Sequence, residues 1–254
     1  MLRSCVAVTV AMIIHEGRSN KLSSPLDLSH PLNNDTQYWI PEEKFYITNR
    51  VVVENSPTPF YAANSFVGHE HCGTHLDAPY HYCKTGWKVD EIPLQRLISP
   101  GLYIDVSDKV NHCNFVLTPQ HLDTWASSHG HIPKGAILLI NFGWWTRYDD
   151  RLDYFGNLTM PYCFPGISLA AADWIVKFGG IYGVGLDTPS LDPGNSYDFP
   201  VHDTLLKNNI FGIENVNFNG TQLKNARFNV IAMPMKITGG SGAPCRLVVI
   251  QSEL

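Results

Sequence analysis

The stretch HEHCGTHLDAPYHY, residues 69–82, places four histidines and an aspartate within fourteen residues. Gly73 and a following proline argue against a continuous helix, because glycine weakens a helix and proline lacks the amide hydrogen that a helix interior uses. In extended backbone His75 and Asp77 project to the same side, since alternate residues of a strand share a face. A tight turn around Gly73 can fold His71 back beside them. The stretch therefore predicts a bend that gathers its side chains around one point.

These gathered side chains have the chemistry of a metal site. His71, His75 and Asp77 supply two imidazoles and a carboxylate, a ligand set that suits Zn²⁺ or Mn²⁺. His81 follows four residues later and is a candidate ligand or a free base in the same pocket. A single histidine is more often a surface or core residue than a ligand, but so dense a cluster is hard to explain as packing. His69 stands outside the spacing, and we expect it to support the site or to be incidental.

The composition of the whole chain favours a folded protein that binds a small molecule. Of its 254 residues, 44% are hydrophobic and 16% charged, which is enough apolar material for a sizeable core. The net charge is −5 and no block of Lys or Arg occurs. This charge pattern argues against a nucleic-acid partner.

The first residues resemble a secretory leader. The apolar run from Cys5 to Ile14 is too short to span a bilayer, which takes roughly 20 apolar residues. It fits the hydrophobic part of a signal peptide, so we expect a leader over residues 1–19, a folded domain over 20–254, no membrane attachment and a secreted or lumenal location. The alternative is a buried first strand in a cytoplasmic protein. Three acceptor triplets for N-glycosylation agree with secretion and predict a glycoprotein: Asn34, Asn157 and Asn219.

Cysteine usage leaves the compartment open. Removal of the leader would leave five cysteines and no CxxC pair, which speaks against a structural zinc ribbon. An odd count allows at most two internal disulfides and leaves one thiol over. Cys72 lies inside the histidine stretch, where it could modulate a metal, pair with Cys83 or another cysteine, or do neither.

Hydrophobic patterning predicts one α/β domain with a mixed, largely antiparallel sheet. Strands are expected at 45–55, 101–106, 136–145, 179–187, 229–237 and 246–251. Helices are expected at 118–127, 168–178 and 202–209, the second with Ser168 as its cap. No composition shift marks a domain boundary.

A second group of candidate residues lies downstream. His202 begins a predicted helix, Glu214 follows an apolar strand-like run, and Asp187 ends another strand. Taken alone, His202 reads as a helix cap and Glu214 as a solvated strand end. Carboxylates at strand ends are as common in turns as in sites.

The motif HCGTHLDAPYH resembles the H-x-G-T-H-x-D-x-P-x-H pattern of the cyclase-type metal hydrolases, the group of bacterial kynurenine formamidase and isatin hydrolase. DLSHPL at 27–32, GLDTPSLD at 185–192 and the interval from His202 to Glu214 follow in the same order. The similarity covers roughly residues 26–250, nearly the whole chain beyond the predicted leader. Cys72 occupies a variable position of the motif.

The resemblance implies a swivelling β/β/α domain, usually a homodimer, with aromatic residues around the substrate. It implies metal ligation by His71, His75 and Asp77, and by His202 and Glu214 where two Zn²⁺ ions are held, with Asp77 and Glu214 between the ions. His81 resembles the catalytic acid/base. Trp39 aligns loosely with an aromatic residue over the substrate, although a core or surface tryptophan is an equal alternative. Trp144 and Trp145 are candidates for a pocket wall or for the core.

The predicted function is therefore metal-dependent hydrolysis of an aromatic amide, with N-formylkynurenine as the leading substrate. Water activated by one or two Zn²⁺ ions or by Mn²⁺ would attack the carbonyl, and His81 would protonate the leaving nitrogen. The chain has no G-x-S-x-G motif, which disfavours a serine hydrolase. The alternatives are opening of a cyclic amide such as isatin, or a secreted metal-binding homologue without turnover.

Overall fold

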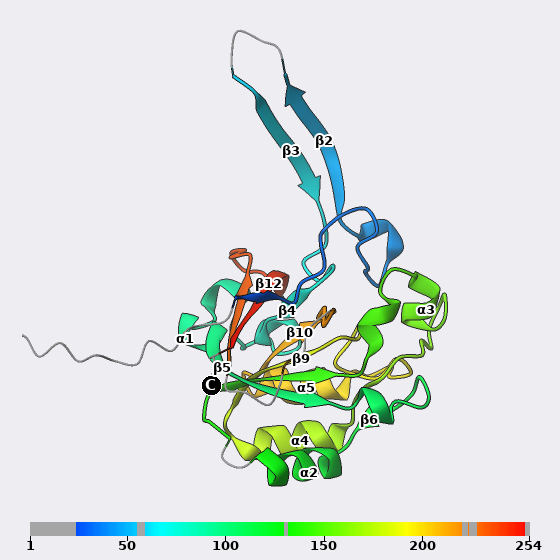
Figure 1. Cartoon of the computed structure of the whole chain (residues 1–254), viewed down its shortest axis with the longest axis vertical. Coiled ribbons are helices and arrows are strands. Elements are labelled where there is room, and N and C mark those ends of the chain that lie inside the picture. The colour runs from blue at the N-terminus through cyan, green and yellow to red at the C-terminus, as the bar shows by residue number, and fades with distance from the viewer. Residues whose placement is uncertain (1–23, 55–58, 130–131, 220–222, 224–227, 252–254) are drawn as a thin grey trace, which may run out of the picture.

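The computed structural model describes residues 24–54, 59–129, 132–219, 223 and 228–251 (Figure 1). The predicted leader over residues 1–19 lies outside the described residues. So does the threonine of the acceptor triplet that begins at Asn219.

An eight-stranded mixed sheet forms the body of the protein, in the order β1-β12-β11-β5-β7-β9-β10-β4. An additional pairing of β4 with β12 joins the two ends, so that seven of the strands form a closed ring. Five of the eight pairings are antiparallel, which confirms the predicted mixed, largely antiparallel sheet. The swivelling of the fold stays a prediction. The strands are β1 (Leu26–Asp27), β4 (His75–Asp77), β5 (Ile98–Asp105), β7 (Ala136–Asn141), β9 (Ile181–Leu186), β10 (Phe211–Glu214), β11 (Phe228–Pro234) and β12 (Gly242–Gln251).

The central strand β7 shows why the sheet forms here. Its sequence AILLIN is buried at every position and lies between two parallel neighbours, β5 and β9. A continuous apolar run of this kind is typical of a strand covered on both faces. Leu138 and Ile140 belong to one core with residues of the helices, whereas Ile137 and Leu139 belong to a second core with residues of β4, β10 and β12. Alternate residues of one strand therefore hold the two layers together.

The three predicted helices are confirmed with small changes at their ends. They are α2 (Pro119–His129), α4 (Leu169–Phe178) and α5 (Pro200–Lys207), and the shorter α1 (Leu94–Leu97) and α3 (Arg151–Phe155) join them. The Ser168 side chain accepts a hydrogen bond from the backbone of Ala171, as an N-cap should. Helix α5 begins two residues earlier than predicted, because Pro200 suits a first turn. Helices α2 and α4 lie side by side beneath the sheet in Figure 1.

The six predicted strands are all present, and four of them are shorter than expected. The run 136–145 ends as a strand at Asn141, and Gly143 adopts a left-handed φ of 73°. A 3₁₀ turn, η5 (Trp144–Arg147), follows. Trp144 is buried in the core and Trp145 packs against the second core. The prediction that they form a pocket wall is wrong, and the aromatic-core alternative holds.

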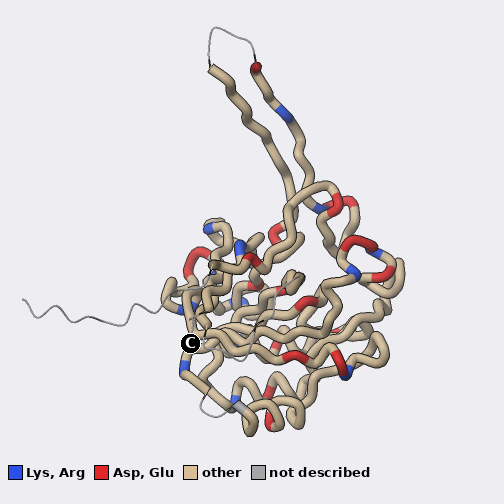
Figure 2. The backbone as a smooth tube through the Cα atoms, viewed as in Figure 1, with Lys and Arg blue, Asp and Glu red and all other residues tan. Residues whose placement is uncertain are grey.

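Two strands project from the body as a hairpin, which we call the arm: β2 (Tyr46–Val53) and β3 (Tyr61–Val67) (Figure 1). Among the strands that the structure describes they pair only with each other, antiparallel. Among the described residues of the arm, Val52, Tyr61, Phe66 and Val67 are each more than half exposed. Arg50 is the one charged residue of the two strands, so the arm is drawn almost entirely in the tan of uncharged residues in Figure 2. The arm is thus an apolar surface with two unpaired edges.

One disulfide, Cys113–Cys163, joins two loops that are separated by 50 residues. Closing a loop of this length in the unfolded chain contributes about 4 kcal/mol of stability in the chain-entropy account. Cys72, Cys83 and Cys245 are free, so the possible pairing of Cys72 with Cys83 is wrong. None of the helices among the described residues has the length and apolarity to cross a bilayer.

Candidate metal centre

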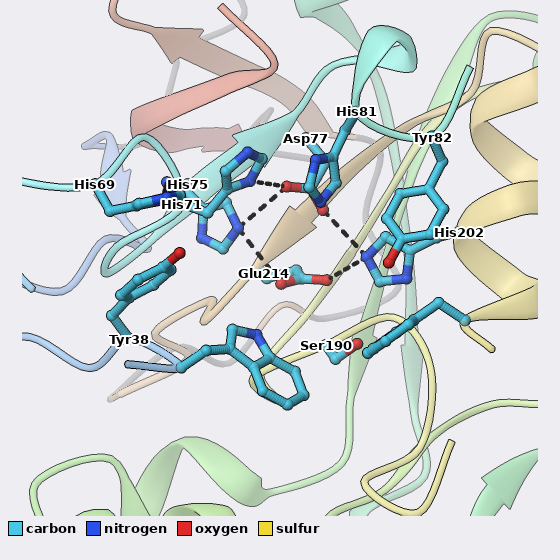
Figure 3. A pocket seen from close by; sticks show the side chains of 12 residues that line it. Tyr38, His69, His71, His75, Asp77, His81, Tyr82, Ser190, His202 and Glu214 are labelled. Atoms are coloured by element: carbon cyan, nitrogen blue, oxygen red, sulfur yellow. Dashed lines mark hydrogen bonds and ion pairs between the residues drawn. The ribbon is translucent and has the colours of Figure 1, made fainter. Parts of the chain in front are cut away.

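The candidate ligands come together because two paired strands bring them to the same face of the sheet. In the antiparallel pairing of β4 with β10, His75 lies opposite Glu214 and Asp77 opposite Gly212. Side chains of opposite residues share a face of the sheet. A side chain on Gly212 would stand 3.1 Å from Asp77 Oδ2, so the glycine leaves room for the carboxylate. The first turns of α5 add His202 from the side (Figure 3).

The carboxylates of Asp77 and Glu214 lie between the imidazoles (Figure 3). Asp77 Oδ1 is 2.6 Å from His71 Nδ1 and 3.2 Å from His75 Nε2. Glu214 Oε2 is 3.4 Å from His75 Nε2, and Glu214 Oε1 is 3.1 Å from His202 Nε2. Asp77 Oδ2 is 3.5 Å from His202 Nε2. Asp77 and Glu214 thus connect the upstream histidines with the downstream one.

Partners outside the cluster fix the orientation of two of the rings. Nδ1 of His75 lies 2.9 Å from the carbonyl oxygen of Gly73, and Nδ1 of His202 lies 2.7 Å from Asp192. A carbonyl and a carboxylate only accept hydrogen bonds, so both Nδ1 atoms carry the proton. Each Nε2 is therefore the ring atom that faces Asp77 and Glu214, and it is the atom that a bound cation would take in place of a proton.

His71 is oriented by a serine and a glutamate. Its Nε2 is 2.9 Å from Ser241 Oγ, and the Ser241 hydroxyl donates to Glu70 Oε2 at 2.7 Å. Because that hydroxyl gives its hydrogen to Glu70, it accepts from Nε2–H of His71. Nδ1 of His71 is then the ring atom that faces the cluster, at 2.6 Å from Asp77 Oδ1. A side chain on Gly242 would stand 2.6 Å from His71 Cε1, so this glycine keeps the place of the ring free.

The charges of the cluster favour a cation. Asp77 and Glu214 are almost fully buried. Burial by itself would lower the pKa of His75, but the carboxylates of Asp77 and Glu214 outweigh it and raise this pKa to about 10. Burial likewise opposes the charge on Asp77, but the surrounding histidines, His75 first, hold its pKa well below its ordinary value. Asp77 Oδ2 is buried without a hydrogen-bond partner. A divalent cation would satisfy that oxygen and supply the positive charge.

Two groups of residues each have possible metal-ligand atoms within 4.8 Å of one another. One group is His71, Asp77 and His81, and the other is His75, Asp77 and Glu214. Asp77 belongs to both. His202 lies beside Asp77 and Glu214 but outside these two groups. Imidazole nitrogens and carboxylate oxygens form a donor set that fits Zn²⁺ or Mn²⁺.

His81 stands at the mouth of the cluster. It lies in the short 3₁₀ helix η2 (Pro79–His81), and its ring stacks on that of His71 with 4.1 Å between centroids. His81 is exposed as a residue. Partial desolvation of its ring by the neighbouring groups lowers the pKa of His81 to about 4, with the charge of Asp77 opposing the shift. His81 is therefore neutral at pH 7 and able to accept a proton.

The cluster forms the floor of a pocket of about 200 Å³. His69 stacks on Tyr38 at the rim with 4.2 Å between ring centroids, so His69 lies in the pocket wall rather than away from the site. The other residues of the rim are Trp39, Tyr82, Ser190 and Phe199. An aromatic rim over a polar floor suits a flat ligand with one polar reacting group.

Six residues singled out from the sequence are therefore neighbours in the structure: His71, His75, Asp77, His81, His202 and Glu214. Trp39 lines the pocket as the resemblance implied. Glu214 is buried, so its reading as a solvated strand end is wrong. Asp187 lies apart and accepts hydrogen bonds from the backbone of Phe142, Trp144 and Trp145, which makes it a structural carboxylate.

Sequence reasoning missed part of the pocket wall. Tyr38 and Phe199 belong to no motif, and Tyr82 and Ser190 lie inside the quoted motifs without being identified as pocket residues. Phe199 has a left-handed backbone with a φ of 46°, which is strained for a residue with a side chain. Cys72 is wholly buried, and burial raises the pKa of its thiol to about 11. It is a neutral thiol that does not line the pocket.

Ser241→Ala is expected to weaken metal binding without removing a ligand. The variant leaves Nε2–H of His71 without its acceptor, so the ring loses its orientation. Loss of such an outer partner typically costs roughly 10–100-fold in metal affinity. Competition with a chelating dye measures the change, and Ser99→Ala, which removes a hydrogen-bonded serine hydroxyl away from the site, is the control. Equal affinity of Ser241→Ala and the wild type would show that Ser241 does not orient His71.

The fold and the cluster define a class, the metal-dependent hydrolases with a site of histidines and carboxylates. The profile of the family described as putative cyclase matches residues 26–193. The chain belongs to this cyclase family and, with its relatives, to the hydrolases.

The relatives and solved structures agree with this assignment. Isatin hydrolase of Roseibium aggregatum is 32% identical over 208 residues, 77% of each chain. Kynurenine formamidase of Bacillus mycoides is 28% identical over 229 residues, 90% of this chain and 98% of the formamidase. The crystal structure of an isatin hydrolase bound to the product analogue thioisatinate superimposes with a TM-score of 0.81 at 28% identity, covering 90% of this chain and 92% of the other.

Proposed function

We propose that the protein hydrolyses an amide whose nitrogen is attached to an aromatic ring, with N-formylkynurenine as the leading substrate and kynurenine and formate as products. The observation that carries this proposal is the pair of buried carboxylates, Asp77 and Glu214, between three oriented histidines at the floor of an aromatic pocket. The similarity to kynurenine formamidases over 90% of the chain supports it.

His71, His75, Asp77, His202 and Glu214 would hold one or two divalent cations, Zn²⁺ or Mn²⁺. When bound there, such a cation lowers the pKa of water to about 7 and polarises a carbonyl oxygen. Glu214 also accepts a hydrogen bond from the backbone of Leu191 at 2.9 Å, which fixes the carboxylate in place. The protein thus supplies a ligand cage that is already oriented.

His81 would move the proton of the reaction. Its neutral ring accepts a proton from the attacking water and returns it to the nitrogen of the departing amine. An aniline-type nitrogen leaves poorly until it is protonated, so this return is the step for which a positioned acid matters most. The stacking of His81 on His71 and its place in the pocket lining support this role.

The aromatic rim would orient the substrate. Trp39 and Phe199 have ring centroids 6.0 Å apart, and Tyr82 stands 6.0 Å from Phe199. Aromatic pairs at such distances interact favourably in tilted or edge-to-face geometry. A benzene ring held there would direct its amide toward the polar floor.

Opening of a cyclic aromatic amide is the second candidate reaction. The 32% identity to isatin hydrolase and the TM-score of 0.81 to its structure favour it. The lactam of isatin also has its nitrogen on a benzene ring, so both candidates use the same bond and the same groups. A homologue that holds metal without turnover is the alternative outside catalysis.

Activity on N-formylkynurenine and isatin, measured together with metal content, tests the proposal. Chelation should abolish hydrolysis, and addition of Zn²⁺ or Mn²⁺ should restore it. Comparison of the two cations at equal occupancy identifies the one that supports turnover. Protein that holds stoichiometric metal but hydrolyses no formanilide or lactam would instead be a binding protein.

We further propose that the protein is a homodimer in which the arm contacts the second copy. An isolated two-stranded hairpin is only marginally stable in water, and unpaired apolar edges are sites of association. Both strands of the arm have such edges, and its exposed side chains are mostly uncharged.

Val52→Lys combined with Tyr61→Lys is therefore expected to convert the dimer into a monomer. The two residues are 57% and 55% exposed, so the lysines leave the isolated chain intact but place charges in the interface. Light scattering after size-exclusion chromatography measures the mass. Leu94→Lys, at a 54% exposed position of α1, is the matched control. A dimer that persists in the double variant would place the interface elsewhere.

We propose, finally, that the protein is secreted or lumenal and glycosylated. Asn34 and Asn157 are exposed on loops, and the Cys113–Cys163 disulfide is of a kind that persists in oxidising compartments. The mass of the exported protein before and after removal of N-glycans tests export and glycosylation together. A mass that still includes residues 1–19 and no glycan would contradict both proposals.

A further inference from the structure

We propose that the Cys113–Cys163 disulfide positions the aromatic side of the pocket, so that an aromatic ligand binds tightly only while the bridge is intact. The inference rests on the proposed function for the choice of ligand and substrate. The contacts around Cys163 carry it.

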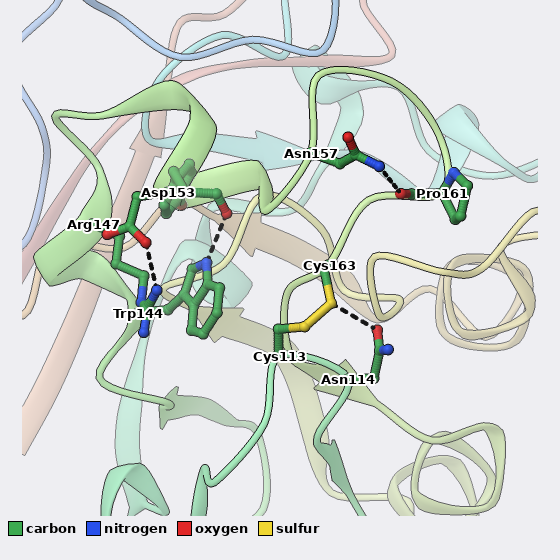
Figure 4. Close-up of a disulfide and its surroundings, with 9 residues drawn as sticks. Cys113, Asn114, Trp144, Arg147, Asp153, Asn157, Pro161 and Cys163 are labelled. Carbon is green, nitrogen blue, oxygen red and sulfur yellow. Dashed lines mark hydrogen bonds and ion pairs between the residues drawn. A yellow bond between two sulfur atoms is a disulfide. The ribbon is translucent and has the colours of Figure 1, made fainter.

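The bridge joins the segment around Cys163 to the loop before β6 (Figure 4). Cys163 lies between α3 and the two-residue strand β8 (Gly166–Ile167), which pairs only with β6 (Val116–Leu117). Cys113 lies just before β6. Besides the bridge, the backbone of Cys163 donates one hydrogen bond to Phe155, and that of Phe164 accepts one from Gly194. The disulfide is the covalent tie of this segment to the body.

Both neighbours of Cys163 support the pocket. Tyr162 and Phe164 pack edge-on against Trp39, with ring centroids 4.9 and 6.1 Å apart, and Phe155 packs on the same indole at 5.8 Å. We call Trp39, Phe155, Tyr162 and Phe164 the aromatic wall. Trp39 itself lines the pocket. One layer of side chains therefore separates the disulfide from the ligand.

The disulfide is accessible to a reductant. Both cysteines are half-buried and line a surface hollow of about 470 Å³ together with Arg147 and Asp153. A dithiol that enters this hollow can reduce the bridge: the S–S bond breaks, Cys113 and Cys163 each gain a proton, and the dithiol becomes a disulfide. The two electrons come from the dithiol, so the exchange is balanced.

Reduction would act more directly on the wall than on the metal ligands of β4. Asp77 and His75 lie on β4, which pairs with β10 and β12 and has no pairing with β6 or β8. Without the bridge, Tyr162 and Phe164 are held by packing and a few hydrogen bonds, and Trp39 loses a fixed support. The expected consequence is weaker binding of aromatic ligands, with metal content and kcat nearly unchanged.

The test compares oxidised protein with protein reduced by a water-soluble phosphine, because thiol reagents would also bind zinc. Mass spectrometry of intact protein confirms the reduction. The Kd of benzoate, measured by calorimetry, should rise roughly tenfold, which corresponds to a loss of about 1.4 kcal/mol of binding free energy. KM for an aryl formamide should rise by a similar factor, whereas KM for a formamide without a ring should not change.

Two variants control the result. Cys113→Ser combined with Cys163→Ser should show the weakened binding in the absence of phosphine and no further response to it. Cys83→Ser removes a free thiol and should keep the full response. If the double variant does not fold, the wild-type comparison still decides. Equal benzoate affinity in both redox states, no benzoate binding by the oxidised protein, or metal loss in step with the weakened binding would each overturn the inference.

The inference and the proposed function fail in different ways. Weaker benzoate binding on reduction, without hydrolysis of any aryl amide in either state, would contradict the proposed function and support the role of the disulfide. Hydrolysis with the same KM in both states would support the function and overturn the role of the disulfide.

Discussion

Asp77→Asn is expected to empty the metal centre and reduce kcat/KM by at least about a thousandfold, because a bound cation supplies several kcal/mol of transition-state stabilisation. Asp77 belongs to both candidate ligand groups, and its carboxylate lies within 3.5 Å of nitrogens from His71, His75 and His202. Asparagine keeps the shape of the side chain but removes its negative charge. Elemental analysis of purified protein, alongside activity on the best substrate, measures both effects.

Asp203→Asn is the control for this experiment. Asp203 neighbours His202 on α5 but forms an ion pair with Lys207 outside the site. We expect it to keep its metal and its activity. Full metal content and full activity in Asp77→Asn would remove the basis for the proposed centre.

His81→Ala is expected to lower kcat by roughly 10²–10⁴-fold, the usual contribution of a positioned acid or base, while the metal content stays the same. The loss should depend on the leaving group. A formanilide needs its nitrogen protonated, whereas 4-nitrophenyl formate releases a stable phenolate without help. The ratio of the two rates, wild type against variant, therefore measures proton donation.

His69→Ala is the matched control, since His69 also lines the pocket but stacks on Tyr38 at the rim. It should affect KM more than kcat. Loss of metal from His81→Ala would instead identify His81 as a ligand, in agreement with its closeness to His71 and Asp77. Equal losses on the anilide and the ester would contradict its role as an acid.

Much of the site could be predicted from the sequence because its ligands are close together in the chain. His71, His75 and Asp77 lie within seven residues, and their spacing alone suggests a bend around one point. His202 and Glu214 were different. Each looked like an ordinary helix or strand end, and only the family resemblance connected them with the first group. The pairing of β4 with β10 supplies the physical reason for their proximity.

The parts that escaped prediction depend on contacts between distant segments. The strand β4 could not be recognised in the histidine motif because its three residues, His75 to Asp77, are too few to show an alternating pattern. The aromatic rim is built from separate loops, and a loop aromatic such as Phe199 looks like any core residue in the sequence. The pairing of Cys113 with Cys163 could not be deduced, since five cysteines allow many combinations.

The strand β4 also closes the ring of the sheet, since it pairs with β10 on one side and β12 on the other. The three residues that join the ends of the sheet are thus the ones that include two candidate ligands, His75 and Asp77. A cation that binds the folded chain alone stabilises it by about 2.7 kcal/mol at a concentration of 100 times its Kd. The melting temperature of this protein should therefore rise with the concentration of free metal. A thermal unfolding curve then reports how much of the metal site is occupied.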